Sequence, residues 1–496
     1  MLSAVLLQSL SLNPKLILTI VLVYFLFLIA ISFITSKDAD NNTFFVGNRQ
    51  SKWYLVAFGM IGASLSGVTF ISVPGWVKTQ QFAYMQMVFG YFFGYVFIAM
   101  VLMPTYYRLQ LTSIYTYLEE RFGKTAHKTG AAFFLISRTF GASFRLLLVA
   151  VVLQQFVMNS LGISFYVTVI ITLVLIWLYT FKGGIKTIVI TDTIQTTVML
   201  VAVALTIYYI AKAMNLSFGD TIATIKNSDY SQIFFFNDFV TSKTHFIKQF
   251  FGGFLIAVAM TGLDQDMMQK NLSCKNIKDA QKNMLSFSVV IIFVNLLFLC
   301  LGALLYLFAM SKNIALPEKS DLLYPTIALQ HLPFIIGLLF VVGLIAAAYS
   351  SADSALTSLT TSFCIDFLGF GRDTNKLQQE KNTRRIVHVV FSIIIFIIII
   401  LFEPYSKTAI IGTIFTVAGY TYGPLLGLYL FGMFTKIEIK DKGVIVVAII
   451  APLLTYLLST KAATWFNGYV FGFELLGINA IITMLGLLLL KKQNIN

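Results

Sequence analysis

The sequence predicts an all-α membrane protein that crosses a lipid bilayer about thirteen times. Of its 496 residues, 58% are hydrophobic and only 11% are charged, and the mean hydropathy is +0.84. Soluble domains have roughly 45–50% apolar and about 25% charged residues. A soluble fold would have too few polar residues to cover so apolar an interior, so lipid must surround most of the surface.

Apolar runs of about 20 residues, the length that crosses the hydrocarbon core as a helix, define the spans. The first run is a span and not a secretory signal, because it lacks a basic start and a small-residue cleavage site and ends on Lys37. In chain order, the predicted spans are 15–35, 54–76, 82–106, 126–158, 162–181, 186–212, 245–266, 284–311, 330–369, 383–402, 406–432, 443–459 and 470–490.

Thirteen crossings place the two ends of the chain on opposite sides of the membrane. With the N-terminus outside and the C-terminus inside, most Lys and Arg residues, Lys270 among them, fall in cytoplasmic connections. The net charge of +14 therefore reflects topology and not nucleic-acid binding. The connections contain no phosphate-binding loop for ATP. The cysteines have no paired spacing, which excludes a disulfide framework or a Cys-ligated metal cluster.

Small and polar residues interrupt two of the spans. The second span contains the run GASLSG at 62–67, and the seventh contains a glycine pair at 252–253. Because these spans are five apart, the pattern indicates two inverted five-helix halves with broken helices around a central ligand. Each glycine pair could instead serve only close helix packing, and the sequence leaves both interpretations open.

An ionisable side chain inside a span costs on the order of 2.5–3.5 kcal/mol on insertion scales and needs a partner or a use, and four of those in the predicted spans call for an account. They are Asp192 in span six, Asp353 in span nine, and Arg138 and Arg145 in span four. The two arginines are seven residues apart, or two helical turns, so they share one face. That face should point to a cavity or to the bundle interior. Alternatively, the arginines pair with the aspartates as packing, or extend to a membrane interface.

Small and hydroxyl side chains recur on one face of span nine. The stripe could serve only helix contact. Beside a carboxylate, however, it favours a wet path lined by hard oxygen ligands, which suit a small alkali cation. The stripe consists of Ala347, Ser350, Ser351, Ser354, Thr357, Ser358 and Thr361.

One segment carries a family signature. Residues 181–195 (FKGGIKTIVITDTIQ) resemble the Gly-Gly…Thr-Asp…Gln pattern of the sodium:solute symporter family, and LSGVTF at 65–70, YLEERFG at 117–123 and DMMQ at 266–269 agree with it. The resemblance covers about residues 40–430. It implies a LeuT-type core of two inverted repeats, at 53–212 and 243–432, with an extra span within 1–36 and two more within 443–490.

The resemblance also implies cation ligands. A primary sodium site would use the backbone carbonyls of Gly62, Leu65 and Ala347 and the hydroxyls of Ser350 and Ser351.

Sialic acid transporters of this family add a second cation site, which here would consist of Asp192, Ser350, Asp353 and Ser354. That branch has a serine where this chain has Asp353. Two carboxylates would hold the cation more tightly, or one of them would carry a proton. Alternatively, Asp353 turns away and pairs with an arginine of span four.

The same branch implies the solute-binding residues. The second span would contribute Ser64, Ser66 and Thr69, the third Tyr84, and the fourth an arginine that grips a carboxylate. Both Arg138 and Arg145 match that arginine. Val88 stands where the branch has glutamine, so sialic acid is not carried over as the substrate.

Together, the residues and the resemblance predict a secondary active transporter. It would couple sodium to the uptake of a small organic solute, such as an organic anion, by alternating access, as a monomer in the cell membrane. Sodium would be the coupling ion, with no cofactor and no nucleic-acid partner. The alternatives are a sodium-coupled sugar, amino-acid or vitamin symporter, a passive channel, and a transporter-like sensor. An enzyme is not expected, because the four histidines lie near span ends with no common partner.

Overall fold

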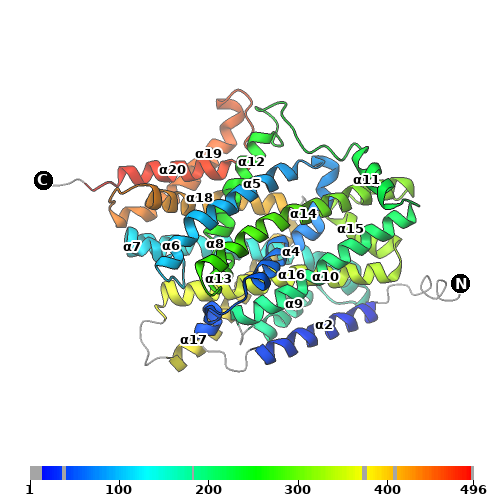
Figure 1. Ribbon diagram of the computed structural model, residues 1–496, viewed down its shortest axis with the longest axis horizontal. Coiled ribbons are helices and arrows are strands. Elements are labelled where there is room, and N and C mark those ends of the chain that lie inside the picture. The colour runs from blue at the N-terminus through cyan, green and yellow to red at the C-terminus, as the bar shows by residue number, and fades with distance from the viewer. Residues whose placement is uncertain (1–13, 36–40, 181–183, 371–376, 406–409, 493–496) are drawn as a thin grey trace.

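The computed structural model describes residues 14–35, 41–180, 184–370, 377–405 and 410–492, and these residues form a bundle of helices without a β-strand (Figure 1). The first half contains α2 (Pro14–Thr35), α3 (Asn41–Val46), α4 (Trp53–Gln80), α5 (Tyr84–Phe97), α6 (Met103–Arg108), α7 (Thr116–Arg121), α8 (Lys124–Leu153), α9 (Phe165–Thr180), α10 (Gly184–Ala213) and α11 (Phe218–Lys226). The second half contains α12 (Phe246–Ala257), α13 (Gln265–Leu272), α14 (Ile277–Ser311), α15 (Leu323–Thr326), α16 (Phe334–Ser362), α17 (Leu377–Phe402), α18 (Ile410–Phe434), α19 (Val444–Trp465) and α20 (Leu475–Leu489).

Ten helices of the described residues are long and apolar enough to cross a membrane, and they coincide with ten of the predicted spans. The predicted seventh span is a pair of helices, Phe246–Gly262 and Gln265–Leu272, bent by 63°. The fifth and thirteenth spans contain shorter apolar helices, Phe165–Leu178 and Leu475–Leu489. The bent pair continues beyond the predicted end at residue 266 as far as Leu272, so Lys270 lies on its second helix.

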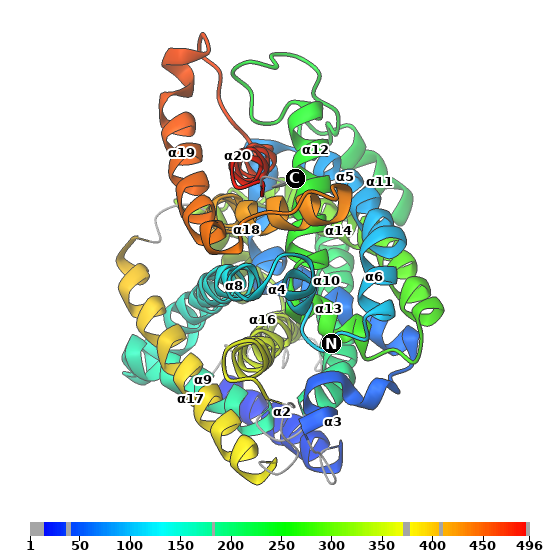
Figure 2. The same cartoon turned by 90° about the vertical axis from the view of Figure 1, so that its left-hand side faces the viewer.

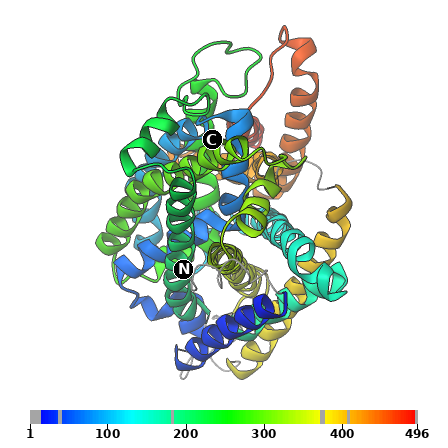
Figure 3. The same ribbon diagram turned by 90° about the vertical axis from the view of Figure 1, so that its right-hand side faces the viewer.

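Two helices form the centre of the bundle. Helix α4 contacts α8, α10, α14 and α16, and α16 in turn contacts α8, α10 and α17. Figure 2 shows α4 and α16 in the interior, with α2, α17 and α19 at the edge. Figure 3 shows α2, in dark blue, along one side of the bundle. In the most apolar stretch of α4, 89% of the residues are buried, whereas in that of α2 only 22% are. Helix α2 therefore presents most of its side chains to lipid.

Helix α4 is broken where the sequence predicts it. Ser66 has φ 36° and ψ 169°, which no helix contains. The run at 62–67 consists mostly of glycine and serine, which weaken a helix interior through backbone entropy and competing hydrogen bonds. A positive φ at serine is strained, and such strain is typical of ligand-binding segments. The break also frees peptide groups that can contact a ligand.

The break in the seventh span is not at the glycine pair. Helix α12 passes straight through residues 252–253, and the chain bends after Gly262, at Leu263 and Asp264. The Asp264 carboxylate then caps α13 by accepting hydrogen bonds from the backbone N–H groups of Asp266 and Met267. The glycines serve helix packing: a Cβ on Gly253 would lie 2.1 Å from the Met87 carbonyl oxygen of α5.

We expect Gly253→Ala to lower the stability of the purified protein by about 1–3 kcal/mol, because the added methyl group meets a backbone atom that cannot move aside. Thermal unfolding in detergent measures the change. The matched control is Gly141→Ala in α8, where a Cβ would meet nothing within 4 Å, so stability should hold or rise slightly. Equal melting temperatures for both variants would contradict the close contact between α5 and α12.

Candidate functional site

One cavity, of about 80 Å³, gathers all the predicted solute-binding side chains. It lies against the break in α4 and is closed by residues of α5, α8, α12, α14 and α18. Its wall includes Ser64, Ser66, Thr69, Tyr84, Arg138 and Arg145. The structure therefore brings these six residues together, although they come from three different helices.

The cavity also has polar side chains that the sequence analysis missed. Tyr91 and Tyr95 extend the face of α5 begun by Tyr84, and the Tyr84 and Tyr91 hydroxyl oxygens are 3.4 Å apart. The spacing of seven and four residues places the three tyrosines on one helical face, a signal that the sequence contained. Thr261 of the seventh span and Asn295 of α14 complete the polar wall, and the Asn295 Oδ1 atom has no hydrogen-bond partner among the described residues.

Arg138 lies next to two carboxylates. Its guanidinium donates to Asp266 of α13 and lies 3.8 Å from the carboxylate of Asp264, to which the Tyr422 hydroxyl of α18 donates. All of these groups are buried. Arg138 therefore ties α8 to the second half of the broken span, and the predicted alternative pairing of Asp353 with an arginine does not involve Arg138.

Arg145 differs from Arg138 in having no such partner. Within the described part of the chain, no carboxylate lies within ion-pair distance of its guanidinium, and its buried Nη1 atom has no hydrogen-bond partner. The Arg145 side chain as a whole is partly buried, and a guanidinium that has lost much of its water without pairing to an anion is costly unless a ligand supplies one. Of the two arginines that the sequence could not separate, Arg145 is thus the one whose charge is available in the cavity.

The predicted primary cation residues lie where α4, α10 and α16 meet. A Cβ on Gly62 would lie 3.3 Å from the Ser350 hydroxyl oxygen and 2.2 Å from that of Thr196, so only glycine fits there. Thr196, which the sequence analysis did not single out, donates its hydroxyl hydrogen to the Asp192 carbonyl. The three helices therefore touch around a group of oxygen atoms.

The hydroxyl hydrogens of Ser350 and Ser351 form hydrogen bonds within the protein. Ser350 donates to the Asp192 carboxylate over 2.6 Å, and Ser351 donates to the carbonyls of Ala347 and Ala348 over 3.4 and 3.0 Å. Their oxygen lone pairs thus remain free to accept a cation. Leu65, the remaining predicted ligand, lines the solute cavity beside the break in α4.

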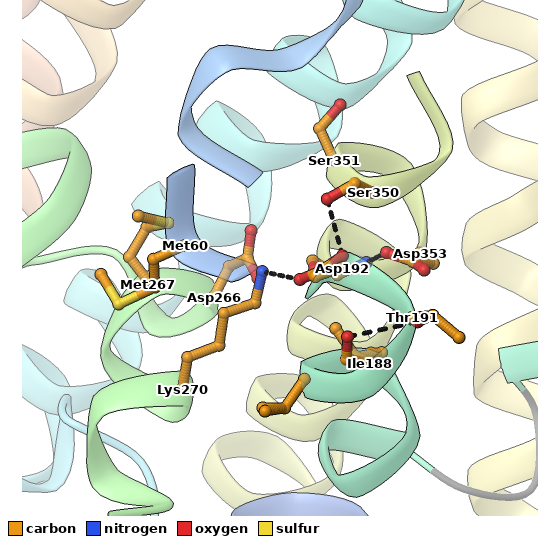
Figure 4. A network of polar contacts seen from close by, with 12 residues as sticks. Met60, Ile188, Thr191, Asp192, Asp266, Met267, Lys270, Ser350, Ser351 and Asp353 are labelled. Carbon is orange, nitrogen blue, oxygen red and sulfur yellow. Dashed lines mark hydrogen bonds and ion pairs between the residues drawn. The ribbon is translucent and has the colours of Figure 1, made fainter. Parts of the chain in front are cut away.

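Asp192 has a partner that the sequence analysis missed. The ammonium group of Lys270 lies 2.7 Å from its Oδ2 atom, and both side chains are at most 1% exposed (Figure 4). With Ser350 on Oδ1, both carboxylate oxygens have a donor. The sequence signal was the spacing of Asp266 and Lys270, four residues apart after the bend, which places both on one face of α13.

Asp353 is fully buried on α16, and its Oδ1 atom accepts a hydrogen bond from the Ser354 backbone N–H over 2.5 Å. The hydroxyl oxygen of Ser354 is buried, and no residue in the part of the chain that the structure describes forms a hydrogen bond with it. Figure 4 shows Asp192, Ser350 and Asp353, three of the four predicted residues of the second cation site, close together. Residues 181–183, which begin the family signature, lie outside the described residues.

The fold and this site define a secondary transporter. Two broken helices meet at a buried polar cavity inside a membrane-spanning bundle, the arrangement that exposes backbone groups to a ligand near the bilayer midplane. Residues 44–451 match the sequence model of the sodium:solute symporter family, and the chain belongs to this family. The resemblance in the sequence signature is confirmed.

Several known proteins are similar over most of their length. The chain is 24% identical over 446 residues to the sodium/sialic acid symporter NanT of Aliivibrio fischeri, covering 88% of this chain and 85% of the relative. It is 23% identical over 427 residues to the sodium/sialic acid symporter SiaT of Proteus mirabilis, covering 84% of each. A solved structure of a substrate-bound, outward-open Na⁺-coupled sialic acid symporter matches with a TM-score of 0.82 and 18% identity, over 96% of this chain and 99% of the other. That likeness shows a shared fold.

Proposed function

We propose that this protein couples the entry of sodium to the uptake of a small organic anion by alternating access. The observation that carries the proposal is the Arg145 guanidinium, which faces the cavity beside the broken part of α4 without a carboxylate partner. A solute carboxylate supplies the missing anion and can accept two parallel hydrogen bonds from the planar guanidinium. The sialic acid symporters among the relatives, whose solute is an acid, support this choice.

Sodium binds at a site separate from the solute cavity. In the proposed mechanism it binds the carbonyls of Gly62, Leu65 and Ala347 and the hydroxyls of Ser350 and Ser351, and so holds α4 against α16. This favours the conformation that binds solute, and each ligand then raises the affinity for the other by the same factor. The membrane potential adds about 2.3 kcal/mol per charge moved through 100 mV.

The same proposal extends to the architecture. We place thirteen crossings by counting the bent pair α12–α13 and the shorter helices α9 and α20 as spans, with the N-terminus outside and the C-terminus inside. Residues 53–212 and 243–432 form the two inverted repeats, residues 1–36 contribute an extra span, and residues 443–490 the last two. The protein works as a monomer in the cell membrane.

A cysteine-labelling experiment tests the topology. In a background with Cys274, Cys300 and Cys364 replaced, a cysteine at the exposed position Lys278 should react with an impermeant maleimide only from the cytoplasm. A cysteine at the exposed position Asn227, after α11, should react only from outside. If Asn227 is labelled from the cytoplasm, the number of crossings before it is wrong by one.

A counterflow experiment identifies the transported solute. Proteoliposomes containing the purified protein are loaded with unlabelled acids, sugars, amino acids or vitamins, and exchange of the labelled compound is measured with and without sodium. We expect exchange for one carboxylate-bearing class, with sialic acids tested first because of the relatives. Exchange of a neutral sugar alone would favour the sugar symporter, and exchange that ignores sodium would favour a passive facilitator.

We expect Ser351→Ala to raise the sodium concentration needed for half-maximal uptake and to abolish concentrative uptake. The variant removes one oxygen ligand while keeping the helix, since Ser351 bonds only to carbonyls of its own α16. Ser358→Ala, two turns further along the same face, is the control, because its hydroxyl also bonds back to its own helix. Wild-type uptake that is unchanged when choline replaces sodium would contradict sodium coupling itself.

A further inference from the structure

Lys270 is a lysine in the interior of the bundle whose ammonium group touches the carboxylate expected to bind a cation. It lies on α13, directly after the bend of the seventh span. Its Nζ atom is 2.7 Å from Asp192 Oδ2, with the two side chains 1% and 0% exposed. Ser350 donates to the other carboxylate oxygen. In Figure 4 the lysine reaches Asp192 from the side opposite Asp353.

An ammonium group and a sodium ion are competing ligands for such a carboxylate. Each carries one positive charge on a compact group, and lysine can direct three hydrogens at oxygen atoms. A buried ammonium stays charged only when a close carboxylate compensates for the lost hydration, so Lys270 is held at Asp192. A sodium ion on the same carboxylate would lie against the ammonium, where like charges repel strongly in a poorly screening interior.

We infer that the Lys270 ammonium fills, as a tethered cation, the position at Asp192 that a second sodium ion would otherwise take. The protein then binds one sodium ion, at Ser350 and Ser351. This inference rests on the proposed function and assigns its ion stoichiometry to one side chain. Helix α13 thus makes two ionic contacts. Lys270 pairs with Asp192, and Asp266 on the same face pairs with Arg138 at the solute cavity.

Sodium binding to the purified protein tests the inference without knowledge of the solute. Radiolabelled sodium is titrated against the full-length protein in lipid nanodiscs at alkaline pH, where protons compete least for carboxylates. We expect one saturable sodium site per wild-type protein and two in Lys270→Gln, because the neutral side chain leaves Asp192 without its cation. Lys270→Arg, which keeps the charge, should retain one site. Lys275→Gln removes the same charge from an exposed position just beyond α13 and should also bind one.

Each outcome separates this inference from the proposed function. Two sites in the wild type, or one site in a folded Lys270→Gln, would overturn the role of Lys270 and leave sodium coupling intact. No saturable site in the wild type would instead overturn the proposed function. If Lys270→Gln does not fold, the wild-type count still decides, together with Asp192→Asn/Lys270→Gln, which removes both charges of the pair and should bind one sodium ion.

Discussion

Replacing Asp192 by Asn is expected to abolish sodium-driven uptake and to lower the stability of the protein by about 3–5 kcal/mol, the usual effect of removing one partner of a buried ion pair. The variant leaves the Lys270 ammonium buried without its carboxylate. The uncompensated positive charge then lies next to Ser350, which loses its acceptor on Asp192 and belongs to the proposed sodium site. Sodium binding should weaken for the same electrostatic reason.

Two comparisons separate the role of Asp192 from simple damage. Asp192→Asn/Lys270→Gln removes both charges, so it should regain stability in thermal unfolding and regain sodium-dependent uptake. Asp353→Ser restores the residue found in the sialic acid branch and should keep coupled transport. Uptake is measured against sodium concentration in proteoliposomes for all three variants. Normal transport by Asp192→Asn with none by Asp353→Ser would make Asp353 the coupling residue instead.

Arg145→Lys is expected to weaken the binding of an acidic solute by about 10- to 100-fold. Hydrogen bonds to charged groups contribute about 1.5–3 kcal/mol, and lysine cannot reproduce the planar two-pronged contact of a guanidinium. Its charge remains, so sodium binding and folding should change little. The measurement is competition by carboxylate solutes in counterflow, and neutral sugars that compete as well as acids would contradict the role of Arg145.

Arg138→Met is the matched comparison, because its arginine shares the helix and the cavity but is paired. The substitution leaves the carboxylates of Asp264 and Asp266 without their cation, so the expected effect is loss of the folded protein. Thermal unfolding and the yield of monodisperse protein measure this effect. A stable Arg138→Met protein with selective loss of acid binding would mean that Arg138, and not Arg145, contacts the solute.

The resemblance and the local composition identified much of the candidate site before the tertiary structure was known. The run at 62–67, in which α4 is broken, contains two glycines, which lower the helix propensity of the segment. By contrast, the pair at 252–253 has a similar composition and breaks nothing, because Met87 of α5 packs against it. Composition shows that a segment can approach another closely, and the neighbouring helix decides whether this becomes a break or a contact.

The sequence by itself determined that the chain is a membrane protein and which of its segments are apolar enough to cross the bilayer. It also placed Asp192, Arg138 and Arg145 inside those segments. These follow from hydropathy and helical spacing, which are properties of neighbouring residues.

Only the tertiary structure decided which charges meet. Lys270 near a predicted span end looked like an ordinary cytoplasmic lysine, and the two arginines looked alike. The bend at Asp264 turns α13 so that Lys270 meets Asp192 and Asp266 meets Arg138, which leaves Arg145 without an ion-paired carboxylate among the described residues. Pairing between helices depends on long-range geometry, because a buried charge is stabilised by whichever opposite charge the fold brings within a few ångströms.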